Sequence, residues 1–437
     1  MTVLPIKTAA ETALAEEFAG AKARLPGGGA VAAGREAAFR RFEASGLPSR
    51  RVEEWKYTDL RALMRDAKPL ATPPATRALQ PQALGDALPD IAAHNVAIIN
   101  GGFAPTWSDV AAGDLAVTIA ELFAWIADNL EAYQELVAQE SDLATALNTA
   151  FVTGGVVVRV RKNACVTKPI HLAYRFIGDA PAAMYPRTLV FVEPGAQVTL
   201  IETYDGPAGI DYQVNAALML VVGDGAKVER IKIGREGAAA LHISSTLTTI
   251  GARADYREFT FTTGGAVTRN QLFLQCAGDG AKIRIAGANL LNGRQHVDST
   301  LVIDHAARGC ESREVFKSVL DGESRGVFQG KIVVRPQAQK TDGRMMTQAL
   351  LLSETAEADN KPELEIFADD VQCGHGATSG RLDENLLFYL KARGIPAKEA
   401  EALLIQAFVG EAIDGIAQEG VRELLTGRVV AWLEARQ

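Results

Sequence analysis

ALMLVVGDGAKVERIKIG, residues 217–234, holds the pattern that decides the fold: an apolar run, a Gly-Asp-Gly-Ala turn, and a run in which Val228, Ile231 and Ile233 stand among charged residues. Short apolar or alternating runs bounded by glycine turns are typical of β-strands. From Phe151 onward the chain repeats this pattern of short apolar or alternating runs, in GVVVRVRK, TLVFVEPG, QVTLIET, KIRIAG and GVFQGKIVV. The sequence therefore predicts a long all-β region.

A weak internal repeat runs through this region. EPGAQV, GDGAKV, TIGARA and GDGAKI place a Gly-Ala pair at Gly195, Gly225, Gly251 and Gly280, at intervals of 30, 26 and 29 residues. A period of this size is typical of stacked solenoid coils, in which each Gly-Ala pair would occupy the tight corner between two strands. The repeat favours a right-handed parallel β-helix, with a double-sheet sandwich as the alternative.

The regions on either side of the β-rich core are predicted to be helical. We expect a mostly helical N-terminal domain at residues 1–150, the β-helix core at 151–382 and a C-terminal helical domain at 383–437. After Pro396, apolar residues recur at helical spacing, as at Ala400, Leu403, Leu404, Ala407 and Phe408. Because a solenoid exposes sheet edges at both ends, each helical region is expected to cap one end.

Composition argues against several classes of protein. The 437 residues carry a net charge of −8 and no evident basic stripe, which argues against nucleic acid or an anionic membrane as the main partner. Cys165, Cys276, Cys310 and Cys373 are scattered without a CxxC pair, as expected of free thiols in a reducing compartment. The N-terminus has no signal or transit pattern, and no apolar run is long enough to span a bilayer. We therefore expect a cytoplasmic protein.

A second stretch, FADDVQCGHGATSGRLDENLLFYLKARGIP at residues 367–396, carries the candidate site. We expect a strand, then a glycine-rich turn that holds Cys373 and His375, then a helix capped by Asp383. Residues i and i+2 of an extended chain project to one face, so a thiolate and an imidazole are offered side by side, a donor pair that soft transition metals accept. The alternative is structural: a lone cysteine is often a small core residue, and a lone histidine a hydrogen-bonded one.

Other chemistry-bearing residues form weaker patterns. His296, Asp298, Asp304, His305 and Cys310 lie close in sequence, but their spacing matches no metal-ligand pattern well, and a structural role is favoured. GESRGVFQGKI has the wrong spacing for a phosphate-binding loop, and no Ser-His-Asp arrangement is present. We therefore predict no catalytic residues and expect that the protein is not an enzyme.

Residues 368–396 resemble the C-terminal signature of the SufB/SufD family, the scaffold proteins of the Suf iron–sulfur cluster assembly system. The matching segment is ADDVQCGHGATSGRLDENLLFYLKARGIP. It is similar to the SufD branch, in which a glycine follows the histidine, as Gly376 follows His375 here. Gly374 departs from the branch, where serine is usual, so hydrogen-bond support for the pair is expected to differ. SRRVEEWKYTDL, residues 49–60, resembles the N-terminal motif of the same branch.

The resemblance implies a β-helix core and a scaffold role without catalysis. It implies pairing with SufB through the last solenoid coils, binding of the ATPase SufC by residues 384–437, and a nascent iron–sulfur cluster, or iron for it, at Cys373 and His375 on the shared interface. An incomplete donor set suits a scaffold that must release its cluster. No tightly bound cofactor is expected in the isolated chain. Two alternatives stay open: a secreted-type carbohydrate-active or carbohydrate-binding β-solenoid, and an architectural homodimer with a vestigial Cys-x-His.

Overall fold

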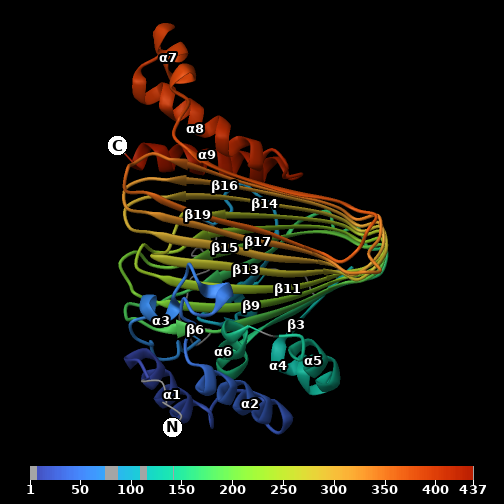
Figure 1. Cartoon of the computed structure of the whole chain (residues 1–437). Coiled ribbons are helices and arrows are strands. Elements are labelled where there is room, and N and C mark those ends of the chain that lie inside the picture. The colour runs from blue at the N-terminus through green and yellow to red at the C-terminus, as the bar shows by residue number, and fades with distance from the viewer. Residues whose placement is uncertain (1–6, 74–86, 109–115, 141, 437) are drawn as a thin grey trace, which may run out of the picture.

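The computed structural model describes residues 7–73, 87–108, 116–140 and 142–436 and places a long β-structure between two groups of helices (Figure 1). The N-terminal elements are α1 (Ala9–Ala21), α2 (Ala30–Ser45), η1 (Glu53–Trp55), α3 (Leu60–Leu63), β1 (His94–Ile99), β2 (Gly102–Phe103), η3 (Pro105–Trp107), β3 (Val117–Glu121), α4 (Leu122–Asp128), α5 (Leu130–Val137) and α6 (Leu143–Phe151). The remaining strands are β4 (Gly154–Val160), β5 (Ile170–Arg175), β6 (Ala183–Met184), β7 (Pro186–Val192), β8 (Gln197–Asp205), β9 (Gln213–Val222), β10 (Lys227–Arg235), β11 (Leu241–Ile250), β12 (Asp255–Thr262), β13 (Val267–Cys276), β14 (Lys282–Leu291), β15 (His296–His305), β16 (Glu311–Leu320), β17 (Arg325–Val334), β18 (Asp342–Leu351), β19 (Glu357–Ile366) and β20 (Gln372–Gly380). The chain closes with α7 (Glu384–Ala392), α8 (Ala397–Ile413) and α9 (Glu419–Ala435).

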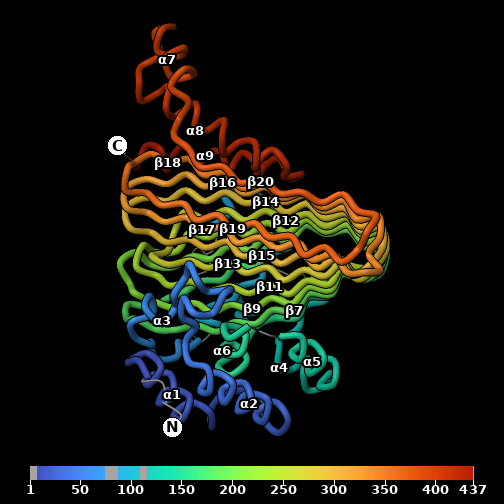
Figure 2. Tube along the Cα trace, in the orientation of Figure 1, coloured from blue at the N-terminus to red at the C-terminus, as the bar shows by residue number. Residues whose placement is uncertain are grey.

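Two 10-stranded sheets form the β-structure. From β7 onward, odd-numbered strands enter one sheet, which we call sheet A, and even-numbered strands enter the other, sheet B. Neighbouring strands in this part are parallel, so each coil adds one strand to each sheet (Figure 2). The chain therefore winds as a parallel β-solenoid, as predicted from the repeat, and the sandwich alternative is wrong.

The corners that lead from sheet A into sheet B repeat from coil to coil. Gly195, Gly225 and Gly280 have φ of 71°, 65° and 70°, a left-handed conformation that glycine adopts without steric cost. Gly251 also lies in its corner, between β11 and β12, but the left-handed position there is taken by Arg253, with φ of 55°. The amide of Arg253 donates a hydrogen bond to the carbonyl of the residue before Gly280, so the corners also bond to one another.

The C-terminal helices lie along the outer face of sheet B and do not cap the last coil. Ile405 of α8 and Leu425 of α9 share an apolar cluster with Ile231 of β10 and Phe259 of β12. In contrast, no residue of β19 or β20 is buried. The expected C-terminal cap is therefore wrong. The physical reason is that the outward side chains of the middle coils of sheet B are apolar and need cover from water.

The first 150 residues combine helices with strands of the solenoid. β1 and β2 extend sheet B, and β3 extends sheet A. α1, α2 and α6 pack together through the rings of Phe18, Phe39 and Phe151, beside the first coils (Figure 1). The division into domains at residues 150 and 383 remains a prediction, and three strands of the first expected domain already belong to the two sheets.

α7 projects from the molecule at the end opposite to the N-terminal helices (Figure 1). Its predicted capping is confirmed: the Asp383 carboxylate accepts hydrogen bonds from the amides of Asn385 and Leu386, and Gly394 beyond its end has φ of 88°. None of its residues is fully buried: Leu387 and Leu390 are half-buried, and Leu386, Phe388 and Tyr389 are exposed. Among the described helices, none has the length and apolar character needed to cross a bilayer.

Candidate functional site at the open end of the solenoid

Cys373 and His375 lie on β20, the last strand of sheet B. The prediction of a glycine-rich turn at these residues is wrong, since the turn precedes them and the strand extends to Gly380. β20 pairs with β18, placing Cys373 opposite Gly343 and His375 opposite the buried Met345. Strand geometry therefore puts both donors on the inward face of the sheet, where the stack of coils ends.

The two donors differ in their surroundings. Cys373 is half-buried and packs against the solenoid core, whereas His375 is exposed. Burial raises the pKa of the Cys373 thiol; the Gly343 amide opposes this shift, and the charges of Asp342 and Glu314 add to it. The thiol is therefore mostly protonated near neutral pH, and a metal ion binding there has to displace the proton.

Gly374, the departure from the family signature, lies between the two donors but on the opposite face of β20. A Cβ atom built on it would meet nothing within 4 Å. A serine would therefore fit there, but its hydroxyl would point away from Cys373 and His375. The expectation that this position supports the donor pair is not favoured by the geometry.

Exposed apolar side chains gather near this end of the chain. Ile366 at the end of β19 and Phe367 just after it are 41% and 58% exposed, and Phe388 and Tyr389 of α7 reach 72% and 53%. Isolated exposed apolar residues are ordinary, but several large ones near one open sheet edge are typical of a protein interface. The terminal coil thus offers two metal donors, an unpaired strand edge and apolar contacts together.

A second group of donors lies inside the solenoid, and sequence reasoning missed it. One ligand atom each from Cys276, His305 and Cys310 can be chosen so that all three lie within 4.8 Å of one another, and all three residues are buried. Cys276 pairs with His305 in the register of β13 and β15. Cys276 and His305 are 29 residues apart, which is the length of one coil. A search for metal-ligand motifs with short spacings does not find such a pair, and only the coil period of the sequence could have indicated it.

The two thiols of this group interact directly. The hydrogen bond between them raises the pKa of Cys276 well above its usual range, and burial adds to this shift. The same hydrogen bond lowers the pKa of Cys310 to about 5, against the effect of burial and with help from His305. Cys165 is exposed, whereas Cys276 and Cys310 are buried, and all are free thiols.

His296 and Asp298 have the structural role that the sequence favoured. The Thr58 hydroxyl donates a hydrogen bond to the Asp298 carboxylate at 2.5 Å and lies 2.9 Å from His296 Nε2. Asp298 also forms a salt bridge with Arg269. These contacts fasten the N-terminal region to the outer face of sheet A. Asp304 points to the surface and pairs with Arg335 at 2.9 Å. The five residues singled out in this stretch therefore do not form one site.

A polar section interrupts the apolar interior of the solenoid. Arg230 contacts Glu202 at 2.5 Å and Glu258 at 2.7 Å. Lys232 lies 3.0 Å from a ring nitrogen of His242 and 2.5 Å from the side-chain oxygen of Asn270. Burial lowers the pKa of Lys232 to about 7. These charged and polar side chains bond to one another, so the polar section is an internal hydrogen-bonded network.

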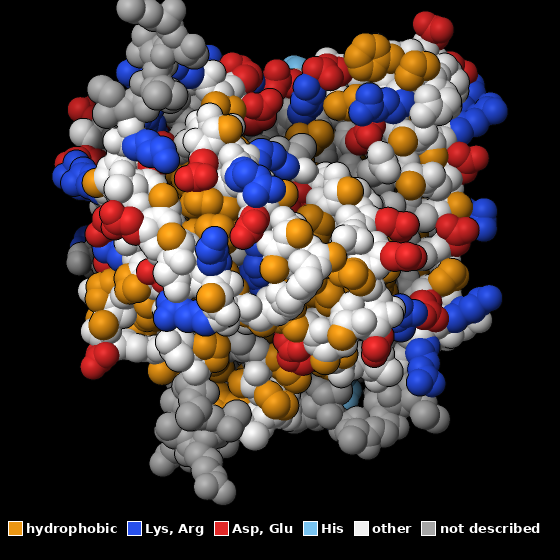
Figure 3. Space-filling model, turned by 90° about the horizontal axis from the view of Figure 1, so that it is seen from below, with side chains coloured by type: hydrophobic (Ala, Val, Ile, Leu, Met, Phe, Trp, Pro, Cys, Tyr) orange, Lys and Arg blue, Asp and Glu red, His pale blue; other side chains and the backbone are white. Residues whose placement is uncertain are grey.

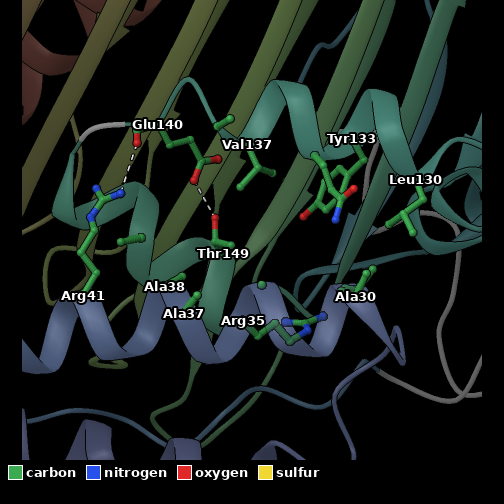
Figure 4. A pocket seen from close by; sticks show the side chains of 15 residues that line it. Ala30, Arg35, Ala37, Ala38, Arg41, Leu130, Tyr133, Val137, Glu140 and Thr149 are labelled. Atoms are coloured by element: carbon green, nitrogen blue, oxygen red, sulfur yellow. Dashed lines mark hydrogen bonds between the residues drawn. The ribbon is translucent and has the colours of Figure 1, made fainter.

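A groove of about 330 Å³ lies between α2, α5 and α6 (Figure 4). Arg41 donates to the carbonyl of Glu140 and Thr149 donates to its carboxylate, while Arg187 forms a salt bridge with that carboxylate at 2.9 Å. Most of its polar groups are thus bonded within the protein, and much of the remaining lining is apolar. Arg35 Nε is a buried donor without a partner among the described residues, but the other guanidinium nitrogens of Arg35 donate to the carbonyls of Ala150 and Pro26. One such atom does not make a ligand site.

A row of four arginines lies in register on four successive strands of sheet B: Arg257, Arg284, Arg313 and Arg344. The sequence showed no basic stripe because these residues are one coil apart. Asp255 and Asp342 form salt bridges with them, which reduces the net charge of the row. On the face seen from below, positive and negative side chains are interspersed (Figure 3). This distribution does not favour a nucleic-acid partner.

Together, the fold and the donors define a class: a β-solenoid that carries thiol and imidazole groups at an uncapped end. The family model described as "SUF system FeS cluster assembly, SufBD core domain" matches residues 175–408, and "SufBD protein N-terminal region" matches residues 26–172. The chain belongs to the SufBD family of the SUF system, as the sequence resemblance indicated.

Relatives match along most of the chain. "Iron-sulfur cluster assembly protein SufD" of Escherichia coli is 30% identical over 386 residues, which cover 88% of this chain and 89% of the relative. "Iron-sulfur cluster assembly SufBD family protein slr0076" of Synechocystis is 32% identical over 386 residues, covering 85% and 84%. SufD of Bacillus subtilis is 29% identical over 293 residues, covering 64% of each chain. Family membership favours an assembly role over the carbohydrate alternative.

Proposed function

We propose that this chain is a non-catalytic scaffold subunit of the Suf iron–sulfur cluster assembly complex. In this proposal it pairs with SufB through its last coils and binds the ATPase SufC through its C-terminal helices. The nascent cluster, or iron for it, is cargo that contacts Cys373 and His375 at the interface between the two scaffold chains.

The observation that carries the proposal is the uncapped last coil. Strands of the first coils, such as β4 and β5, are almost entirely buried, whereas β19 and β20 contain no buried residue. An open strand edge is normally covered or blocked in a monomer, so a long exposed edge favours a partner chain. A second solenoid docked there would place its own donors beside Cys373 and His375.

Two donors from one chain are too few to retain a cluster. Stable clusters are held by four protein ligands, commonly cysteines. A thiol and an imidazole supply half of such a set, so the partner must provide the rest, and separation of the chains would release the cargo. His375 is the more accessible ligand, and Cys373 supplies either a metal ligand or a sulfur carrier.

α7 supports the proposed docking of SufC. It is a capped helix with Leu386, Phe388 and Tyr389 exposed, and it has no buried residue of its own. A helix in this state gains stability when a groove of another protein covers its apolar side chains.

The ligand role is tested by co-expression with SufB and SufC. His375→Ala should lower the yield of iron and acid-labile sulfide in the purified complex several-fold, without loss of any subunit. Gly374→Ser is the matched control: it changes the neighbouring residue on the opposite face, and its yield should equal that of the wild type. Unchanged yield in His375→Ala within an intact complex would refute the ligand role.

The docking role is best tested by point variants. Deleting residues 384–437 would uncover the apolar outer face of sheet B, because α8 and α9 cover it. Phe388→Ser combined with Tyr389→Ser should instead abolish capture of SufC without lowering thermal stability. Lys391→Ser, on the same helix, should retain SufC. Full retention by the double variant would contradict docking through α7.

The homodimer alternative has a separate test. Light scattering of the isolated chain, followed by titration with SufB, should show a heterodimer that replaces any self-pair. A homodimer that persists in excess SufB would favour the architectural alternative.

A further inference from the structure

The buried Cys276, His305 and Cys310 come together through the geometry of successive coils. Cys276 ends β13 and His305 ends β15, and the two are register partners in parallel strands. Side chains of register partners on neighbouring strands lie about 5 Å apart. The corner at residues 306–309 then reverses the chain and brings Cys310 back to the same point, so that one ligand atom from each residue lies within 4.8 Å of the others. All three are fully buried, at 0% exposure.

An unpartnered ring nitrogen is the second, independent observation. His305 Nε2 lies 3.0 Å from the Ser312 hydroxyl, whereas His305 Nδ1 has no hydrogen-bond partner among the described residues. Leaving a buried polar atom unpaired costs about 1–3 kcal/mol, and such atoms in native proteins call for a bound ion, water or a functional reason. If Ser312 accepts from Nε2–H, then Nδ1 keeps its lone pair and is prepared to bind a metal ion.

We propose that Cys276, His305 and Cys310 form an internal binding site for a thiophilic divalent metal ion of the Zn²⁺ or Fe²⁺ type. Two thiolates and one imidazole are the donor set that such ions prefer, and the fourth tetrahedral position is left to a small ligand. Ser312 is a positioning residue, because it fixes the ring through the other nitrogen. Metal binding is an exchange: the ion enters, and the two thiols together release the protons they still hold.

The geometry needs only a small adjustment. Two sulfur atoms bound to a tetrahedral zinc ion at about 2.3 Å lie about 3.8 Å apart. The present separations, at most 4.8 Å, are therefore within about 1 Å of a coordinating arrangement. Two thiolates also neutralise a divalent ion, which removes the cost of burying net charge. The bound ion would tie β13 and β15 to the corner that leads into β16, where Cys310 lies.

This site is distinct from the proposed cargo site at Cys373 and His375. It lies inside the solenoid, it uses only this chain, and its donors are not accessible to a partner. Its test therefore needs neither SufB nor SufC, and its failure would leave the proposed function unaffected. The reverse also holds, because loss of the cargo role would not alter metal binding by the isolated chain.

Cobalt(II) is the probe for the first experiment. The reduced, metal-free full-length protein, titrated with Co²⁺ without oxygen, should show intense thiolate-to-cobalt charge-transfer absorption that saturates at one ion per chain and is displaced by Zn²⁺. Cys276→Ser and Cys310→Ser should each lose most of this absorption. Cys165→Ser, which changes an exposed free thiol, is the matched control and should keep it. Absorption that is absent in the wild type, or that is retained in full by both Cys276→Ser and Cys310→Ser, would overturn the proposal.

A second measurement does not depend on how the variants fold. X-ray absorption at the zinc edge of the zinc-loaded wild type should give two sulfur neighbours and at least one imidazole nitrogen. The melting temperature of the wild type should rise with Zn²⁺, and that of Ser312→Ala should rise less, because the imidazole is no longer held in place. A zinc shell without sulfur, or binding with only one sulfur neighbour, would refute the site.

Discussion

Arg230 is a buried cation held between two buried carboxylates in the solenoid interior. Its guanidinium contacts Glu202 at 2.5 Å and Glu258 at 2.7 Å, and all three side chains are almost inaccessible. Because each charge is compensated by the others, removing the central one leaves two carboxylates facing each other in a medium of low polarity.

Arg230→Met is therefore expected to lower the free energy of unfolding by about 3–5 kcal/mol. Urea denaturation measures this change. Arg257→Met is the control on the neighbouring strand: Arg257 is partly exposed and lies 3.6 Å from Asp255, so its loss should cost less than about 1 kcal/mol. Equal losses in the two variants would contradict the burial argument.

Glu314 makes stability depend on pH. Its side chain is fully buried, and both carboxylate oxygens lack a hydrogen-bond partner within the described part of the chain. Burial raises its pKa from 4.5 to about 8. Below pH 4.5 both the folded and unfolded states hold the proton. Between about 4.5 and 8 only the folded state holds it, so the contribution of this group to stability falls as pH rises.

Glu314→Gln should remove this dependence. Relative to the wild type, the variant should gain stability steadily from about pH 4.5 to 8, by up to a few kcal/mol, and the difference should level off above pH 8. Chemical denaturation at several pH values gives the curve. Glu311→Gln changes an exposed residue of the same strand and should follow the wild type. A constant difference between Glu314→Gln and the wild type would show that the carboxyl does not titrate as stated.

At the residue scale, the sequence identified one group of donors and missed another. Cys373 and His375 were found because they are two residues apart. Cys276 and His305 stayed hidden because they meet only after the register of β13 and β15 is known. Their partner Cys310 was noticed, but it was grouped with His296 and Asp298, which face the N-terminal region. To predict contacts between successive coils, the exact number of residues in each coil must be known. The degenerate repeat, with intervals of 26 to 30 residues, did not give this number exactly.

At the scale of elements, α7 has a well-formed cap but little packing, with Leu387 and Leu390 only half-buried. Asp383 accepts from two backbone amides, and no residue of the helix is buried. α1 offers a contrast: Thr8 caps it in a capping box, and Leu14 and Phe18 pack it into the N-terminal apolar cluster.

Asp383→Ala should loosen α7 without destabilising the whole protein. Loss of the cap costs about 1 kcal/mol, which in an unpacked helix is felt locally. Amide hydrogen exchange at residues 384–392 should therefore become faster by roughly 5-fold, while the global unfolding transition stays in place. Thr8→Ala is the matched control and should lower global or N-terminal stability instead. A shifted global transition in Asp383→Ala would contradict the independence of α7.

The sequence predicted where helices and strands occur better than it predicted which side of each element is buried. In α8 the predicted apolar face included Leu403 and Ala407, which are exposed, whereas Ile405 and Val409 face sheet B. This helix has apolar residues on more than one side, so its period alone does not select the buried face. In β20, glycines predicted a turn, but pairing with β18 overrode their low strand propensity.

For the whole molecule, stability is expected to be graded along the solenoid. Each coil contacts mainly its neighbours, so a terminal coil has half of the contacts of an internal one. β19 and β20 should therefore show the fastest amide exchange of the strands from β7 onward, and β11, β13 and β15 the slowest. Hydrogen exchange with mass spectrometry measures this order. Adding SufB should slow exchange in β19 and β20 selectively, and uniform protection along the stack would contradict both the graded picture and the proposed interface.

The difference between the two ends also limits how many chains can join. A solenoid that was bare at both ends could add copies without limit and form fibres, because each added copy would present a fresh edge. Here the N-terminal helices lie beside the first coils (Figure 1), whereas β19 and β20 at the other end have no buried residue. In the proposed pairing these exposed ends of two solenoids would meet, which would give a closed pair with Cys373 and His375 at its midpoint and would leave no exposed last coil for a third chain.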